Sequence, residues 1–499
     1  MMNQRILIPN RGIVALDILN ALKGNGLETI LLFSPEDIFS LPVKMADFCY
    51  KFYSSRPEDS YLDREAIIEK ALELKVDFIH PGYGFLAEDI DFFKMAEENN
   101  IRVIGPESHL LELINDKLQL REMARSLEIE PLHHSQMFKD PLDFETIAQE
   151  LQYPIIIKPK SASAGRGIKI GRERRQATTI IKEMLNREEY INQGVFVEHY
   201  YRQGQQVEIP FIRDKRGHTL LYPEIESSLQ RRFRKIFQES PSPNLTDTMR
   251  ERLYQQTLKI IKAINYTGLG YAEFIINDNN CYFSELNTTV QTNTLIPELH
   301  SSTNLIRLQL EVARGNTLKG VRQTKIVPSR YHIALVSLMA ENPFDDFTPS
   351  SGTVKEFYHY PAQNSIFKSS LYTGARKSPL YDPYVGKLAT FAKQRAEAIA
   401  TLNQSLEQIT IKGIRTNLSF LKSLLTCDDL IQGNTHIDFV NEKQNMLKRK
   451  RSNREIQVAA ALLAAAFHVE NGKQNYKEDL ATRKQPGFFK RLIYRFRGR

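Results

Sequence analysis

Two segments separated by a short turn carry the residues best suited to chemistry. The pattern predicts a strand over 271–277, a turn at 278–280 and a second strand over 281–287. Because strand side chains alternate, Glu285 and Asn287 share one side, and the hairpin can bring Glu273 onto it. Two carboxylates and an amide oxygen are hard ligands suited to Mg²⁺ carrying nucleotide phosphates. The alternative is an amphipathic hairpin with two glutamates facing solvent.

A lysine followed by small residues gives a second candidate for phosphate binding. A buried strand ends at Lys158, and the segment 161–167 reads Ser-Ala-Ser-Ala-Gly-Arg-Gly. Small residues allow backbone N–H groups to approach phosphates, and lysine supplies positive charge. Lys117 opens a helix after Asp116 and offers another ammonium group. An ordinary hairpin with a basic turn and a surface lysine are the competing interpretations.

An apolar strand over 195–201 leads to a polar turn. Such a segment can present Glu198 and backbone groups to an adenine ring, although a plain edge strand fits equally well.

Taken in chain order, the motifs resemble biotin carboxylase, a member of the ATP-grasp superfamily, over roughly residues 3 to 443. The matching residues are Asn10-Arg11-Gly12, His80 to Leu86, Asp116-Lys117, Lys158, Gly165-Arg166-Gly167, Glu198, Val207-Glu208-Ile209, Gln230-Arg231-Arg232, Lys235, Glu273-Phe274, Glu285-Leu286-Asn287 and Tyr381 to Leu388. The family's reaction uses ATP and bicarbonate to make carboxyphosphate, and then carboxylates biotin on a carrier.

The resemblance implies a fold of mixed α/β and α+β class with three domains. An N-terminal open βαβ domain would cover 1–113, and an ATP-grasp domain would cover 114–318, with a mobile lid at about 130–204. An α+β C-terminal domain would cover 330–443, and residues 448–499 would form a basic linker, an Ala-rich helix and a basic tail. A length of 499 residues agrees with about three domains.

The resemblance also implies residue roles in a site for ATP and Mg²⁺, with Mn²⁺ as a substitute. Lys235 would face the phosphates and the bicarbonate, and Gln291 is a retained residue of the catalytic segment. Nucleotide-binding residues would be Lys117, Lys158, Gly165, Gly167, Glu198, Tyr201 and Gln230, and metal ligands would be Glu273, Glu285 and Asn287.

The acceptor half departs from the family's pattern. Thr289 stands where the family has the arginine that holds bicarbonate, Asn293 where it has the glutamate base, and Ser337 where it has a second arginine. An amide cannot remove a proton, and threonine and serine carry no positive charge. Carboxylation of biotin is therefore expected to be weakened, or another acid to be activated. The alternative is a non-catalytic, ATP-binding member that regulates or scaffolds a carboxylase complex.

The positive charge is confined to the end of the chain. The net charge is +8, but residues 448–454 contribute +5 and residues 472–499 contribute +7, which leaves −4 elsewhere. This distribution argues against a nucleic-acid partner. Cys49, Cys281 and Cys427 are too far apart for a metal motif, and the start lacks an apolar leader. We therefore expect a cytoplasmic protein in a reducing compartment.

Partners follow from the resemblance and from the tail. The chain has no Ala-Met-Lys-Met motif, so covalently bound biotin is not expected, and a separate biotin carrier and a carboxyltransferase would be needed. The family is commonly dimeric, but Asp17 and Asn20 replace arginines of the bacterial dimer face, which does not favour a homodimer. The tail can form a basic amphipathic helix for an acidic partner or membrane surface, or a solvated terminus.

Overall fold

The structure is a computed structural model that describes residues 4–24, 26–149, 151–159, 167–187, 190, 194–449 and 461–465. It divides into two compact units, residues 1–444 and 445–499, and the first contains the elements discussed below. Gly165 and most of the predicted Ala-rich helix and tail lie outside the described residues. Residues 461–465, within the predicted Ala-rich segment, are helical.

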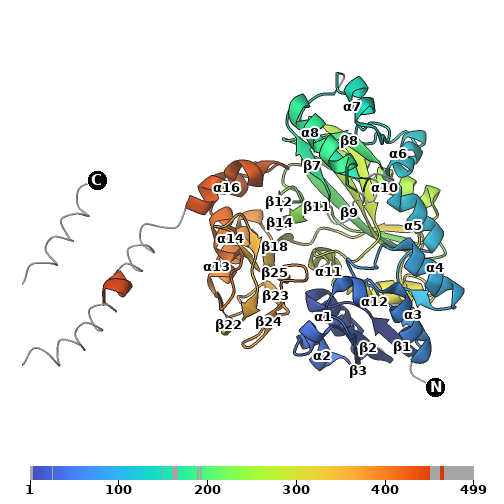
Figure 1. The fold of residues 1–499 in the computed structure, drawn as a ribbon, viewed down its shortest axis with the longest axis vertical. Helices are drawn as coiled ribbons and strands as arrows, with labels where there is room; N and C mark the ends of the chain where they lie inside the picture. Colours follow the sequence, from blue (N-terminus) through green and yellow to red (C-terminus); the bar gives the residue numbers. More distant parts are fainter. Residues whose placement is uncertain are drawn as a thin grey trace, which may run out of the picture. The chain divides into compact units, whose positions relative to one another are not determined.

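The N-terminal residues form an open parallel sheet, as the alternating pattern predicts (Figure 1, blue). Its strand order is β3-β2-β1-β4-β5, with β1 at Gln4–Ile8, β2 at Leu27–Phe33, β3 at Phe48–Lys51, β4 at Phe78–Ile79 and β5 at Arg102–Val103. The helices are α1 (Gly12–Leu22), α2 (Leu41–Met45), α3 (Arg64–Glu73) and α4 (Ile90–Glu98), followed by α5 (Ser108–Asn115). Asp63 and Asp89 cap α3 and α4 by accepting from backbone N–H groups, which fixes where these helices begin.

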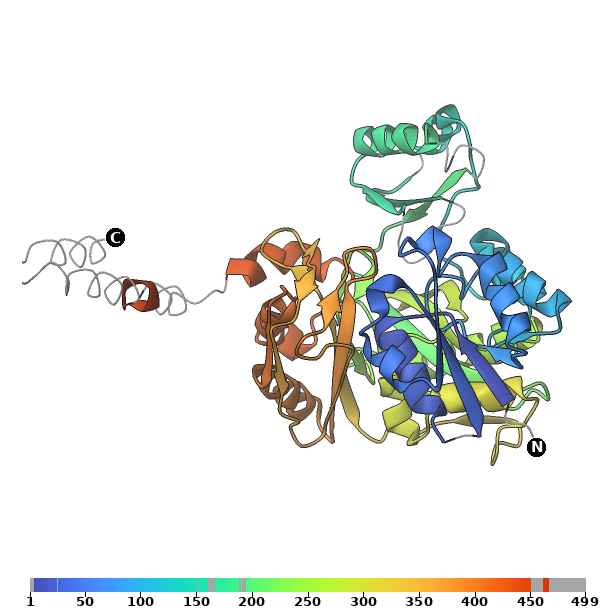
Figure 2. The same ribbon diagram turned by 60° about the horizontal axis from the view of Figure 1, so that its bottom comes forward.

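A second, smaller sheet lies in the region predicted to be the lid. It contains β6 (Ile155–Pro159), β7 (Lys169–Gly171) and β8 (Val195–His199) in the order β7-β6-β8, with α7 (Pro141–Ile147) and α8 (Arg174–Leu185). The module projects from the rest of the first unit (Figure 2, green). It has its own apolar core, which includes Phe144, Ile155, Ile181 and Val195.

The pattern of the sequence predicts a helix over 143–152, and this prediction is wrong in its bounds, because α7 begins and ends earlier. Asp140 accepts a hydrogen bond from the N–H of Leu142, and Pro141 occupies the first turn. Both features are typical of a helix N-terminus and place the start ahead of the apolar pattern.

The largest sheet has ten strands and joins residues from both sides of the predicted boundary at 318–330. Its main order is β16-β15-β9-β11-β14-β18-β25-β23; β10 pairs with β9, and β17 pairs with β10. The strands are β9 (Gln205–Arg213), β10 (Thr219–Leu221), β11 (Ile225–Glu226), β14 (Phe237–Ser240), β15 (Gly268–Asn277), β16 (Asn280–Asn287), β17 (Thr324–Ile326), β18 (His332–Met339), β23 (Ser365–Ser369) and β25 (Tyr384–Ala392). The pairing of β14 with β18 makes the sheet continuous across that boundary.

Helices and short strand pairs complete the first unit. The helices are α6 (Lys117–Ser126), α10 (Asp247–Ala263), α11 (Leu295–Ser301), α12 (Leu305–Ala313), α13 (Arg395–Glu407), α14 (Leu418–Leu425) and α15 (Asp428–Gln432); α16 (Phe439–Arg449) continues into the second unit. The pairs are β12 (Gln230–Arg231) with β13 (Arg234–Lys235), β19 (Glu341–Asn342) with β20 (Thr348–Pro349), β21 (Gly352–Thr353) with β24 (Arg376–Lys377), and β22 (Glu356–His359) with β26 (Ile409–Lys412).

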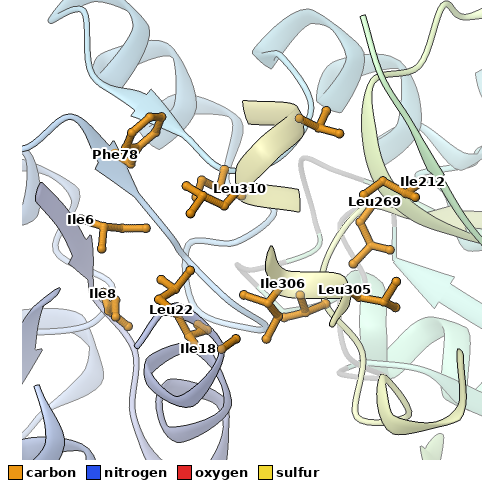
Figure 3. Close-up of a cluster of buried hydrophobic side chains, with 14 of the residues drawn as sticks. Ile6, Ile8, Ile18, Leu22, Phe78, Ile212, Leu269, Leu305, Ile306 and Leu310 are labelled. Atoms are coloured by element: carbon orange, nitrogen blue, oxygen red, sulfur yellow. The ribbon is translucent and has the colours of Figure 1, made fainter. Parts of the chain in front are cut away.

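Helix α12 joins the N-terminal sheet to the large sheet through one apolar core. Figure 3 shows Leu305, Ile306 and Leu310 of this helix among side chains from both sheets. Ile18 lies in α1, and Leu269 lies in β15. Because the core is shared, the carboxyl ends of the N-terminal strands are held in place relative to the large sheet.

The connection between β8 and β9, residues 200–204, is tied to the chain just before α16. Ile437 donates its backbone N–H to the carbonyl of Gly204 (2.9 Å). Tyr200 donates its hydroxyl to Asp438 (3.2 Å), and Arg202 forms an ion pair with the same carboxylate (2.9 Å). We call residues 200–204 the hinge segment, because they connect the small module to the large sheet.

A carboxyl group buried in the large sheet makes the stability of the fold depend on pH. Glu226 is 1% exposed and accepts from the hydroxyls of Ser228 and Ser242, and burial raises its pKa to about 7. An acid whose pKa is raised by folding stabilises the folded state while protonated, so stability falls as pH rises from about 4.5 to about 7.

We expect the Glu226→Gln variant to unfold at a temperature several degrees above wild type at pH 8, and at nearly the same temperature at pH 4.5. The amide is neutral at both pH values and keeps the size of the side chain. Thermal denaturation of both proteins at the two pH values tests this, and an equal difference at both would contradict it.

Candidate active site

The two predicted carboxylates face each other across the hairpin. Glu273 of β15 pairs in register with Glu285 of β16, and Asn287 donates its side-chain amide to Glu273 (2.9 Å). The turn residues Asp278 and Asn279 both have positive φ, at 48° and 64°, as a two-residue type I′ turn requires. The turn pairs Asn277 with Asn280, and a register shift at Glu273/Phe274 then places Glu273 opposite Glu285 rather than Ser284. The turn and this β-bulge together bring the three oxygen-bearing side chains close to one another.

Each carboxylate is paired with a lysine that was predicted to bind phosphate. Lys117, the first residue of α6, forms an ion pair with Glu285. Lys235 forms ion pairs with Glu273 (2.7 Å) and with the fully buried Glu208 (2.6 Å). Burial alone would raise the pKa of Glu285, but Lys117 and Lys158 outweigh it and hold that pKa below its usual range. The cations and anions of the site therefore neutralise each other.

The pair Glu273 and Glu285 would supply only part of the ligands that a metal ion needs. No group of three or more His, Cys, Asp or Glu residues that could hold a metal ion occurs in the part of the chain that the structure describes. Two carboxylates and one amide, each binding through one oxygen, would leave half of the positions of an octahedral Mg²⁺ to other ligands, as is usual for Mg²⁺ bound together with phosphates.

Glu198 lies near the end of β8 in the small sheet, and each of its carboxylate oxygen atoms forms an ion pair. It pairs with Arg121 (2.8 Å) and with Lys158 (2.7 Å), and it is 1% exposed. Burial raises its pKa, but the two cations prevail and lower it to about 2. Sequence reasoning offered this side chain to adenine, whereas the structure surrounds its oxygen atoms with Arg121 and Lys158.

Arg121 was missed by sequence reasoning. It is completely buried, and its Nε donates to the carbonyl of Ser284 (3.0 Å) next to Glu285. The available signal was its position four residues after Lys117, which places both cations on one face of a helix. An arginine on the apolar face of α6, with Leu120 and Ala124 buried around it, indicates a buried anionic partner.

We expect Arg121→Met to destabilise the protein by on the order of 3 kcal/mol, because Glu198 would keep one of its two cations in a buried setting. Arg125→Met is the matched control, since Arg125 is 54% exposed and pairs with Glu122 on the same helix. Denaturation midpoints of the two variants measure the difference. Equal midpoints would show that the buried pair contributes no more than a surface pair.

Two further nucleotide-site candidates lie close to these groups. Tyr201 stacks on Tyr282, with ring centroids 4.8 Å apart, and its hydroxyl is 3.1 Å from Nδ1 of His133. Gln230 donates its side-chain amide to the side-chain oxygen of Gln206 (2.8 Å). The amide nitrogen of Gln206 in turn donates to Glu273 (2.7 Å). Gln230 is therefore linked to the carboxylate pair through one amide.

Gly167 is required by its surroundings. Its φ is +76°, and a Cβ atom there would come within 2.8 Å of the Tyr190 hydroxyl and 3.0 Å of Pro159. A side chain at this position, just before β7, would therefore adopt a strained backbone conformation and would require Tyr190 or Pro159 to shift.

The four acceptor-side residues carry no positive charge. Gln291 donates to the hydroxyl of Thr289 (3.0 Å), and Asn293 donates its amide to Glu208 (3.0 Å). Asn293 and Ser337 are both fully buried. The Ser337 hydroxyl lies beside the phenol of Tyr384, whose pKa burial raises well above its usual value. Glu208, which bridges Lys235 and Asn293, was not assigned a role by sequence reasoning.

Asp17, predicted to alter a dimer contact, is used within the chain. It forms ion pairs with Lys387 (2.6 Å) and Lys368 (3.3 Å), and its side chain is only 11% exposed. Asn20, one turn later in α1, is exposed.

Among the described residues, no helix combines the length and apolar character needed to cross a bilayer.

Comparison with protein families assigns the three parts of the chain. "Biotin carboxylase, N-terminal domain" matches residues 2–111, "Carbamoyl-phosphate synthase L chain, ATP binding domain" matches residues 116–321, and "Biotin carboxylase C-terminal domain" matches residues 336–442. Together these matches cover the first unit almost completely.

Full-length relatives and solved structures agree with these matches. The chain is similar to biotin carboxylase 1 of Bacillus subtilis, with 33% identity over 446 residues, or 88% of this chain and 98% of the relative. Biotin carboxylase of Pseudomonas aeruginosa is 31% identical over 455 residues, and the match covers 90% of this chain and 100% of the relative.

Among solved structures, the biotin carboxylase domain dimer of Hydrogenobacter thermophilus 2-oxoglutarate carboxylase, in complex with MgADP, ADP and bicarbonate, has a TM-score of 0.84. It is 28% identical, and the match covers 90% of this chain and 99% of that one. Campylobacter jejuni biotin carboxylase has a TM-score of 0.82 at 29% identity, covering 88% and 98% of the two chains. Because relatives above 30% identity are matched over almost their full length, the chain belongs to the biotin carboxylase family of ATP-grasp ligases.

Proposed function

We propose that this chain binds Mg·ATP at the carboxylate pair Glu273 and Glu285, with Asn287 beside them. The observation that carries the proposal is the pairing of these two carboxylates with Lys235 and Lys117. Mg²⁺ bound to the carboxylates would release both lysines to the phosphates, so metal and nucleotide replace the ion pairs with equivalent ones. The Hydrogenobacter relative, whose structure contains MgADP, supports this assignment.

The remaining nucleotide contacts follow the same proposal. Lys158 would contact phosphates while sharing Glu198 with Arg121. Tyr201 and the rest of the hinge segment would lie against the base. Gly165 and Gly167 would belong to the loop over the phosphates. Gln230 would hold Glu273 through Gln206.

We infer that the reaction is the ATP- and bicarbonate-dependent carboxylation of carrier-bound biotin, at a rate well below that of family members with the full acceptor site. Loss of one donor to a developing negative charge costs about 10²–10³ in rate, and losses in one unit need not multiply. Lys235 and Gln291 are the retained catalytic candidates. Thr289, Asn293 and Ser337 stand where the family has a cation, a base and a second cation.

One observation favours the non-catalytic alternative, in which the chain binds ATP and regulates or scaffolds a carboxylase complex. Asn293 donates its amide to Glu208, and Glu208 also forms an ion pair with Lys235. Glu208 is therefore not free to take the place of the missing general base.

The partners follow from the family reaction. A separate biotin carboxyl carrier protein and a carboxyltransferase would supply and use the carboxylated biotin. The Hydrogenobacter relative is described as a dimer. The ion pairs of Asp17 inside this chain support a different use of the α1 face here. We propose a cytoplasmic location, although some relatives are chloroplastic or mitochondrial.

Steady-state ATP hydrolysis by the full chain tests the proposal. Phosphate release is measured with Mg²⁺, and then with bicarbonate and free biotin added separately and together. The proposed ligase shows slow hydrolysis that requires Mg²⁺ and rises when both additions are present. Binding of Mg·ATP without any stimulated turnover would support the regulatory alternative, and no binding would contradict both.

A further inference from the structure

A cleft separate from the nucleotide site lies between the N-terminal sheet and the strands of the C-terminal region. Its volume is about 140 Å³, and its lining includes Arg11, Asp37, Phe39, Leu371, Arg376 and Lys377. None of the residues proposed to hold nucleotide or metal lines it. The cleft is large enough for a small organic molecule rather than a single water.

Lys377 brings a buried positive charge to this cleft. It is 7% exposed, and its Nζ donates to the carbonyl oxygens of Ser378 (2.8 Å) and Tyr381 (3.4 Å). No carboxylate forms an ion pair with it in the ranges that the structure describes. Burial lowers the pKa of Lys377 to about 8, and the nearby Arg11 adds to this effect. A buried ammonium group of this kind is stabilised by an anion brought close to it.

The neighbouring residue adds a second cation. Arg376 is exposed and forms no ion pair with any described residue, whereas Arg11 is committed to both carboxylate oxygens of Asp37 (2.7 Å each). Glu36 is the other acidic residue in the lining. Arg376 and Lys377, which form no ion pair with any described residue, together with Glu36 give the lining a net charge of +1. This charge matches a ligand with one negative charge.

Apolar side chains form two facing parts of the remaining lining. Phe39 is 70% exposed and Ile38 is 43% exposed at one side, and Leu371 and Val385 lie at the other. Tyr372 donates its hydroxyl to the carbonyl of Phe39, which joins the two sides across the cleft. An apolar body between these walls would bury surface that is otherwise in water.

We propose that this cleft binds a small organic carboxylate, whose charge pairs with Lys377 and Arg376 and whose apolar body lies against Phe39 and Leu371. The proposal is independent of the nucleotide site, and its test contains no ATP.

The test is a titration of the full chain with hexanoate, followed by the methyl NMR signals of Ile38, Leu371 and Val385. The signal of Ile181, in the core of the small module, is the internal reference. We expect saturable shifts at the three cleft residues and none at Ile181. Hexan-1-ol has the same apolar body without the charge and should bind at least about tenfold more weakly. Equal binding of the alcohol, or no saturable shift, would overturn the proposal.

Two variants separate the cations. Arg376→Gln should weaken hexanoate binding about threefold and Lys377→Met about tenfold, because the first charge is exposed and the second is buried. Arg415→Gln, which removes an exposed arginine outside the cleft, is the control and should bind as wild type does. Should Lys377→Met fail to fold, the surface variant Arg376→Gln decides, and unchanged binding there would reject the proposal.

Discussion

Replacing Glu285 by glutamine is expected to change the affinity for ADP in opposite directions with and without Mg²⁺. The affinity for Mg·ADP should fall on the order of 100-fold, because the metal loses a carboxylate ligand. The affinity for ADP in the presence of EDTA should rise several-fold, because Lys117 loses its ion pair with Glu285 and becomes available to phosphate. Calorimetric titrations under the two conditions measure both changes.

Glu128→Gln is the control for this experiment. The Glu128 side chain is 92% exposed, and the substitution removes the same charge away from the carboxylate pair. It should leave both affinities within about twofold of wild type. A fall in affinity under both conditions for Glu285→Gln would indicate a general loss of structure, and unchanged Mg·ADP binding would show that Glu285 is not a metal ligand.

Restoring the family's acceptor-side chemistry is expected to raise ATP hydrolysis that depends on bicarbonate and biotin by at least about 100-fold. The variant combines Thr289→Arg, Asn293→Glu and Ser337→Arg. Tyr384→Ala is added, because the Tyr384 phenol lies beside Ser337, both side chains are buried, and an arginine at 337 would overpack this region. Phosphate release and carboxylated biotin are measured together.

The single substitutions serve as controls and should not restore turnover, since the three groups act as a unit. Asn293→Glu alone should also lower the unfolding temperature, because it places a second carboxylate about where the Asn293 amide now donates to Glu208. Recovery in the combined variant would show that the scaffold is otherwise competent. Continued inactivity of a folded, Mg·ATP-binding combined variant would favour the regulatory alternative.

Local patterns predicted the elements whose causes are local. Side-chain alternation and the turn signal were sufficient to predict the hairpin that carries Glu273 and Glu285, whereas the β-bulge at Glu273/Phe274 that sets their exact pairing was not predicted. The helix at 141–147 was misplaced because its start depends on the cap at Asp140 rather than on apolar periodicity. The ten-stranded sheet could not be derived, since the pairing of Phe237 with Val336 joins strands far apart in the chain.

The same limit applies to the site. Alternation shows which residues share a face, but it does not show which opposite charge a lysine will meet. Arg121 and Glu198 form their pair only after α6 and β8 come together in the fold, so the sequence indicated two unconnected charged residues. Likewise, Glu208 belongs to the site because it contacts Lys235 and Asn293, and neither residue is close to it in the sequence.

The ties between the hinge segment and the chain before α16 have a consequence for how the protein is made. Tyr200 and Arg202 are bonded to Asp438, and Gly204 to Ile437. During synthesis, every residue proposed to contact the nucleotide therefore leaves the ribosome well before residues 437 and 438, which hold the hinge segment in place. A polypeptide whose translation stops before residue 437 would contain all of those residues and still lack the anchor of the small module. The newly made protein can therefore acquire a fastened nucleotide site only after residues 437 and 438 have left the ribosome.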